Sequence, residues 1–125
     1  MGKQVIWNKS PAQEDFTAAQ SYLSLICPSR RAGALVARLR RTKTVGHAAK
    51  DLLRASGLPL LSRDEKQVAS DLKRIHKGKA LSPVLLVQGA MKRGVPLTVA
   101  DGYHRICAGC HFDEDAPIAC RIVTD

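Results

Sequence analysis

Apolar residues in the first part of the chain recur at intervals of three and four, a pattern that predicts amphipathic helices. The first helix begins after Ser10, which forms a capping box with Gln13, and Pro28 ends it. A second helix covers residues 29–41. The expected buried positions of the two helices are Phe16, Ala19, Leu23, Ile26, Ala32, Leu35, Val36 and Leu39.

Two further helices are predicted before residue 80. One is capped by Thr44 and runs to about Ser56, with Gly57 as its stop. The other opens with a capping box at residues 62–65 and closes at Gly78. Their expected buried positions are Val45, Ala48, Ala49, Leu52, Leu53, Val68, Leu72 and Ile75.

The pattern after Gly78 changes to that of strands. Residues 84–87 form a continuous apolar run, typical of a buried strand, and residues 97–99 predict a second strand paired with it. A helix to about Phe112 and a last alternating strand at 118–123 follow. The prediction is a single α+β domain, a small sheet with packed helices preceded by a mostly helical basic region.

Charge is unevenly distributed along the 125 residues, with 20 Lys and Arg against 11 Asp and Glu. Residues 1–80 hold 16 basic and six acidic side chains, whereas residues 81–125 hold four and five. A basic half joined to a near-neutral half favours contact with a polyanion such as a nucleic acid. A merely soluble basic surface is the alternative.

One face of the second predicted helix is the best candidate for contact with a nucleic-acid backbone. No acidic residue lies between positions 30 and 43 to neutralise this helix. Basic side chains on such a face neutralise phosphates without reading bases, although a solvated helix face explains them equally well. The candidate residues are Arg30, Arg31, Arg38 and Arg41.

The stretch from Leu97 to Ala108 concentrates candidate chemistry. A strand that ends in Asp101 and Gly102, followed by a helix start, directs free N–H groups and the positive end of a helix dipole to one place. Arg105 can grip phosphate oxygens, and His104 can donate a hydrogen bond or move a proton. The sequence therefore predicts a phosphate site at this turn.

The four cysteines favour a structural interpretation. Cys107 and Cys110 lie one turn apart on a predicted helix, and a zinc site built from them with His111 and Cys120 lacks the two separated ligand pairs typical of structural zinc. Small apolar core cysteines are favoured, and no metal ligands are assigned. The sequence shows no secretory signal and no run long enough to span a bilayer, so a cytoplasmic protein without membrane contact is expected.

The second half of the chain resembles the ParB/sulfiredoxin superfamily over roughly residues 62–123. The residues that carry the resemblance are the Ser-Pro strand of positions 79–87 and the Asp-Gly-Tyr-His-Arg turn of 101–105, in that order. The chain is most similar to small bacterial ParB-like nuclease-domain proteins. The resemblance implies a ParB/sulfiredoxin-like core at 62–125 and leaves residues 1–61 as a separate basic, helical region within one domain, 1–125.

The resemblance implies that the turn holds nucleotide phosphates, since members of the superfamily use ATP, CTP or ADP. The residues implied are Gly102, His104 and Arg105, with Asp101 assisting a metal ion such as Mg²⁺ and Tyr103 within the same turn. Kinases of the group use an acid from the helix before the first strand. Glu65 matches that position best, with Asp64 behind it, so Glu65 and His104 are the catalytic candidates, although the capping box at residues 62–65 is the favoured explanation of Glu65.

Two departures narrow the expected activity. Tyr103 stands where sulfiredoxin has its reactive cysteine, so peroxiredoxin repair is not expected. The second nucleotide motif and the helix-turn-helix of a full ParB are missing, so partition-complex assembly is not expected either.

A nucleic-acid- or nucleotide-binding protein, such as a regulator from a mobile element, is the favoured interpretation. A phosphate-directed enzyme (metal-dependent nuclease, NTPase or small kinase) and a protein–protein module without ligand binding remain alternatives.

Overall fold

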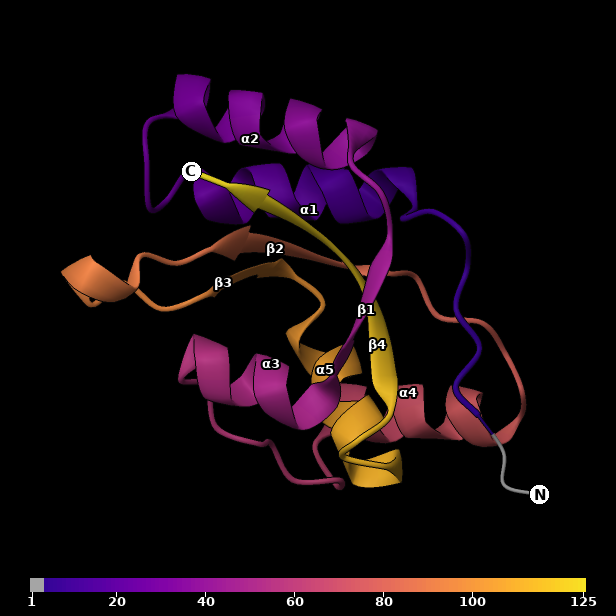
Figure 1. Ribbon diagram of the computed structural model, residues 1–125. Coiled ribbons are helices and arrows are strands. Elements are labelled where there is room, and N and C mark those ends of the chain that lie inside the picture. The colour runs from indigo at the N-terminus through magenta and orange to yellow at the C-terminus, as the bar shows by residue number, and fades with distance from the viewer. Residues whose placement is uncertain (1–3) are drawn as a thin grey trace.

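A four-stranded mixed sheet organises the chain, and helices cover both of its faces (Figure 1). The computed structural model describes residues 4–125. The strands are β1 (Val45–Ala48), β2 (Val84–Gln88), β3 (Thr98–Asp101) and β4 (Pro117–Thr124), in the spatial order β1-β4-β2-β3. β4 runs antiparallel to β1 and parallel to β2, and β3 is antiparallel to β2. The predicted α+β class is confirmed.

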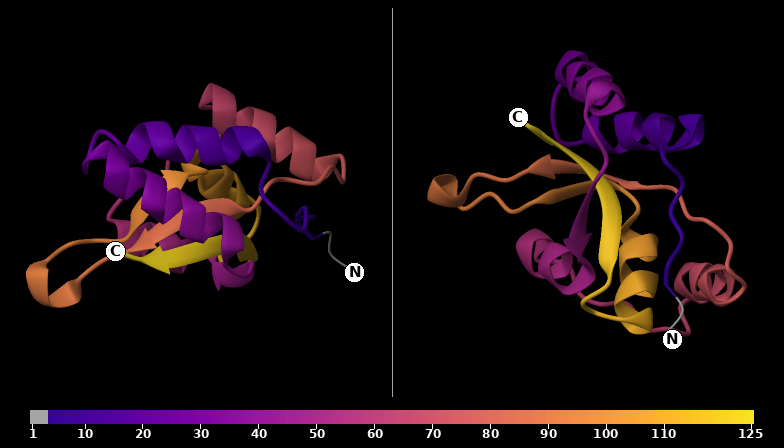
Figure 2. Two further views of the ribbon diagram at one scale, coloured as in Figure 1. Left: turned by 90° about the horizontal axis from the view of Figure 1, so that it is seen from above. Right: turned by 45° about the vertical axis from the view of Figure 1, so that its right-hand side comes forward.

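The two faces of the sheet bury separate apolar clusters. Helices α1 (Gln13–Leu23) and α2 (Ser29–Arg41) cover one face, where Leu39 and Phe16 pack on Leu85 and Val123. Helices α3 (Ala49–Ser56), α4 (Lys66–His76) and α5 (Tyr103–Phe112) cover the other, where Ile106 lies in the cluster. The β2–β3 connection contains the short 3₁₀ helix η1 (Met91–Arg93) and extends away from the body of the molecule (Figure 2).

Residues 45–48 form a strand, so the prediction of a helix from Thr44 is wrong over its first turn. Val45 pairs with Cys120 and Ala48 with Pro117, and the helix starts only at Ala49. The β-branched Val45 and the following Gly46 disfavour a helix, and pairing with a distant strand outweighs the local helical periodicity. The N-terminal half therefore contributes an edge strand to the sheet as well as helices.

Two predicted helix starts and one predicted helix end are wrong in position. α1 begins at Gln13, where the Asp15 carboxylate accepts a hydrogen bond from the N–H of Ala12 at 2.8 Å. Glu65 itself caps α4, which begins at Lys66. α1 ends at Leu23 rather than running to Pro28, which leaves Ile26 exposed.

Arg121 is a buried arginine that joins three separate segments. Its Nη1 donates to the carbonyls of Leu39 (3.2 Å) and Arg40 (2.9 Å), the last turn of α2. Its Nη2 donates to the hydroxyl of Ser10, and its Nε donates to the hydroxyl of Thr44. The negative end of the α2 dipole and these oxygens stabilise the buried charge.

Candidate functional site

The turn from β3 into α5 requires glycine at position 102. Gly102 has φ of 108°, a backbone conformation that residues other than glycine rarely adopt. A Cβ there would lie 2.4 Å from Cγ1 of Val84, at the start of β2. The backbone of the turn is therefore pressed directly against β2, and no side chain caps the start of α5.

A hollow of about 280 Å³ opens at this turn. Asp101, Gly102, His104 and Arg105 line one side of it. The α4 helix supplies the other side. The residues of α4 that line the hollow are Gln67 and Asp71.

Arg105 is held by carboxylates. Its Nη2 lies 2.9 Å from Oδ2 of Asp101, and its Nη1 lies 3.6 Å from Oδ1 of Asp15 on α1. The Nε of Arg105 is buried without a hydrogen-bond partner among residues 4–125. The guanidinium therefore positions the turn through two ion pairs and keeps one donor unsatisfied.

Burial disfavours the charge on the acids that line the hollow. The pKa of Asp101 is raised from 3.8, chiefly by desolvation, and Arg105 opposes the rise. Desolvation likewise raises the pKa of Asp71, with a smaller opposing effect of Arg105. The hollow therefore holds two carboxylates whose ionisation is costly, and a bound cation would favour their charged form.

Glu65 and His104 approach each other but do not share the hollow. His104 Nε2 lies 3.9 Å from Oε1 of Glu65, and both side chains are partly exposed. The same Glu65 oxygen accepts hydrogen bonds from the N–H groups of Gln67 and Val68 at 2.8 and 2.9 Å. Glu65 is thus occupied as a helix cap, and Asp71 is the acid of α4 that faces the candidate site.

Tyr103 points away from the hollow. Its hydroxyl donates a hydrogen bond to the carbonyl of Pro59, and its ring packs against the core beneath the sheet. The structure therefore brings together four of the five predicted turn residues and assigns Tyr103 a packing contact.

Sequence reasoning missed three residues around the turn, namely Asp15, Gln67 and Asp71. Asp71 could have been found, because it lies on the buried stripe of α4 between Val68 and Ile75, where an acid is out of place. Asp15 had no such signal, since its approach to Arg105 depends on how α1 packs against β3.

The arginines predicted to contact nucleic acid are not equivalent in the structure. Arg31 forms an ion pair of 2.6 Å with Asp125, and Arg38 donates to the carbonyl and hydroxyl of Thr124. Arg30 and Arg41 are exposed and have no ion-pair partner within residues 4–125. Only these two are free to bind an anion without breaking an existing contact.

The cysteines are distributed as packing residues. Cys107 and Cys120 are fully buried, and burial raises the pKa of Cys120 to about 11. Within residues 4–125, no group of three or more His, Cys, Asp or Glu side chains is arranged to hold a metal ion. Of the helices in that range, none is long and apolar enough to cross a membrane.

Comparisons with protein-family models, curated proteins and solved structures gave no significant match to this chain.

Proposed function

We propose that the turn of residues 101–105 binds the phosphate of a nucleotide, as the resemblance to the ParB/sulfiredoxin superfamily implies. The observation that carries the proposal is the hollow at the uncapped start of α5, into which His104 and Arg105 project from the first turn. Free N–H groups at a helix start and a nearby cationic side chain form a recurring phosphate site.

The acids of the hollow favour a phosphate that arrives with a divalent cation. Asp71 and Asp101 line the hollow, and Asp15 and Asp101 already pair with Arg105. A bare phosphate would meet repulsion from these carboxylates. Mg²⁺ commonly binds through one or two carboxylates together with phosphate oxygens, so Asp71 and Asp101 fit that ion. Bound there, the ion would offset the negative charge of both the carboxylates and the phosphate.

Each remaining residue has a distinct part in this proposal. The N–H groups of the first turn of α5 bind phosphate oxygens, and His104 donates a further hydrogen bond from the open side of the hollow. Arg105 fixes Asp101 through their ion pair, and its guanidinium adds positive charge behind the turn. Gly102 allows the ligand to approach the backbone closely.

A phosphate-directed enzyme is the second candidate, and Asp71 is the observation that favours it. The carboxylate lies in the hollow, and its pKa is raised by burial, as is common for general bases. In that case Asp71 takes the role that the sequence assigned to Glu65, with His104 as its neighbour across the hollow.

Calorimetric titration with ATP, ADP, CTP and GTP, each with and without Mg²⁺, tests the proposal. We expect one nucleotide to bind in a Mg²⁺-dependent manner, and His104→Ala to weaken binding about tenfold or more. His104 is partly exposed, so its replacement leaves the fold intact. His47→Ala, on the exposed strand β1, is the matched control. The proposal is wrong if no nucleotide binds or if the two variants behave alike.

A further inference from the structure

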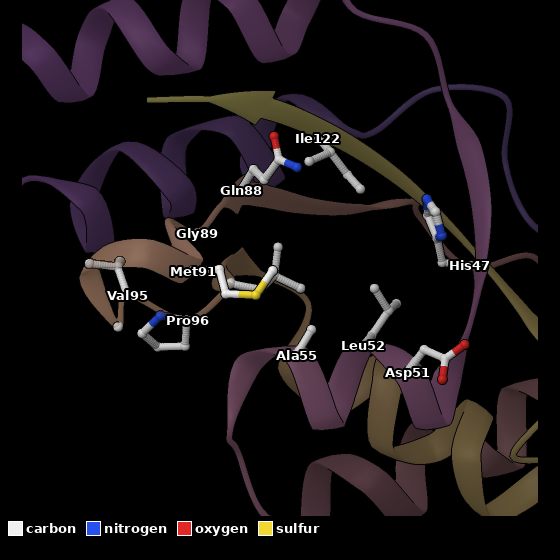
Figure 3. A pocket seen from close by; sticks show the side chains of 12 residues that line it. His47, Asp51, Leu52, Ala55, Gln88, Gly89, Met91, Val95, Pro96 and Ile122 are labelled. Atoms are coloured by element: carbon white, nitrogen blue, oxygen red, sulfur yellow. The ribbon is translucent and has the colours of Figure 1, made fainter.

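The sheet has an edge that β1 covers only in part. β1 pairs with β4 from Pro117 to Cys120, whereas β2 pairs with the opposite side of β4 from Cys120 to Thr124. Residues 121–124 of β4 therefore have a neighbouring strand on one side only, within the part of the chain that the structure describes. In Figure 3, β4 continues beyond β1 with Ile122 at the uncovered stretch.

Backbone groups of β4 face this uncovered edge. The N–H of Ala49 donates to the carbonyl of Ala116, which extends the β1–β4 ladder by one residue pair. Because bonded pairs alternate in an antiparallel ladder, Ile118 and Cys120 bond to β1, and Ile122 and Thr124 turn toward the same side. The carbonyl of Thr124 already accepts a hydrogen bond from Arg38. The N–H and C=O of Ile122 and the N–H of Thr124 are thus directed to the open edge.

An apolar hollow lies beside this edge on the α3 face of the sheet (Figure 3). Its volume is about 630 Å³, within the range of ligand-binding clefts. Met91, 93% exposed at the tip of the β2–β3 connection, Leu52 of α3 and Ile122 of β4 are among its apolar lining residues, and Gln88, His47 and Asp51 are its polar ones. An exposed apolar hollow of this kind suits the side chain of a partner.

A second hollow flanks the same edge on the α2 face. It measures about 430 Å³ and is lined by Arg38, Arg41 and Thr42 together with residues 122–124. No acidic side chain lines it, and Arg41 has no ion-pair partner within residues 4–125. Ile122 lines both hollows, so the strand edge runs between an apolar cavity and a cationic one.

We propose that the open edge of β4 at residues 121–124 binds an extended segment of an acidic partner protein by strand addition. Successive side chains of a strand point to opposite faces, so the added strand places an apolar side chain in the hollow of Met91 and an acidic one beside Arg41. Main-chain bonds to Ile122 and Thr124 supply affinity, and the two hollows select alternating apolar and acidic residues.

Charge argues for a partner protein rather than a second copy of this chain. The chain has a net charge of +9, and strand addition between two copies would bring arginines of α2 against the same residues. The sequence also contains no run in which apolar and acidic residues alternate. Opposite charge at the rim steers association and suppresses like-charged partners.

A labelled synthetic peptide, Val-Glu-Val-Glu-Val-Glu with both ends blocked, tests the proposal by fluorescence anisotropy. We expect it to bind, and we expect Val-Lys-Val-Lys-Val-Lys and the block sequence Val-Val-Val-Glu-Glu-Glu to bind at least about tenfold more weakly. Amide exchange measured by NMR should slow at Ile122 and Thr124 on addition of the alternating peptide.

Variants on exposed positions separate this surface from the rest of the molecule. Arg41→Glu should weaken peptide binding about tenfold, whereas Arg30→Glu, at the other end of α2, makes the same charge change and should have no effect. Met91→Ser should also weaken binding, and Lys92→Ser should not.

Four outcomes would overturn the proposal. The first is no binding of the alternating peptide at concentrations up to about 1 mM. The second is equal loss with Arg41→Glu and Arg30→Glu. The third is a sedimenting dimer that excludes the peptide, which would assign the edge to a second copy. The fourth is displacement of the peptide by a short DNA duplex in the wild type but not in Arg41→Glu, which would assign the surface to nucleic acid.

Discussion

Gly102 shows how one residue fixes the position of the candidate phosphate site. The sequence identified this glycine correctly, because a strand, a turn and a helix start around it require a positive φ. What the sequence could not show is the distance to Val84, a contact between residues far apart in the chain. The turn is therefore constrained from both its own backbone and the neighbouring strand.

Gly102→Ala should lower the free energy of unfolding by about 3 kcal/mol or more, because the added methyl group must displace Val84 and hold an unfavourable φ. Urea denaturation measures the change. Gly94→Ala is the matched control: Gly94 has φ of 69° with no atom near its missing Cβ, so only the backbone cost of about 1 kcal/mol applies. Equal losses in the two variants would contradict the close contact with Val84.

Asp71 is a buried carboxylate whose pKa is raised above 3.8, chiefly by desolvation. Between 3.8 and the folded-state pKa, the folded protein binds more protons than the unfolded chain. The contribution of Asp71 to stability therefore falls as the pH rises through that interval. At neutral pH this residue is a source of instability that the proposed ligand would offset.

Asp71→Asn should raise the free energy of unfolding at pH 7 by on the order of 1 kcal/mol, because the amide has no charge to desolvate. The gain should shrink as the pH is lowered and vanish below 3.8, where the carboxyl is protonated in both states. Thermal denaturation across this pH range measures both effects, with the exposed Asp64→Asn as control. A stability loss in Asp71→Asn at neutral pH would mean that the ionised carboxylate is stabilising.

At the scale of elements, the sequence predicted α2, β2, β3, α5 and β4 well, misplaced the ends of α1 and missed β1. Residues 84–87 are apolar at every position, which is typical of a buried strand. Residues 45–48, by contrast, follow a helical spacing and form a strand only because β4 is present to pair with them. Local patterns predict elements that are stable by their own periodicity and miss those that depend on a distant partner.

The exposed ends of α2 lead to a prediction on nucleic-acid affinity. Arg30 and Arg41 are free, whereas Arg31 and Arg38 already contact the last residues of β4. If this helix binds DNA, Arg30→Ala and Arg41→Ala should each reduce the slope of log affinity against log salt by about one. Anisotropy with a labelled duplex at several salt concentrations measures the slope, with Lys92→Ala as control. A salt-independent affinity would exclude backbone contacts by α2.

At the scale of the whole molecule, Arg121 connects segments that lie far apart in the chain. It bonds to the segment before α1, to the end of α2 and to the residue before β1. Nothing in the sequence around Arg121 predicts this, since an arginine in an alternating strand is expected to face solvent. Predicting that Arg121 is buried would have required the position of α2 relative to β4, which the sequence does not specify.

Arg121→Met should lower the free energy of unfolding by about 3 kcal/mol, because two carbonyls of α2 and two hydroxyls lose a charged donor while the volume is nearly conserved. Urea denaturation measures it, and the exposed Arg63→Met is the control. Stability equal to that of the wild type would mean that water replaces the guanidinium at no cost.

The place of β4 in the sheet has a consequence for synthesis on the ribosome. β4 lies between β1 and β2, yet it follows both in the chain. While the polypeptide is being made, β1 has no strand to pair with, and the apolar stripes of α1 and α2 have only part of their docking surface. The domain therefore completes its sheet only when residues 117–124 have left the exit tunnel, so the nascent N-terminal half is the portion that we expect chaperones to engage.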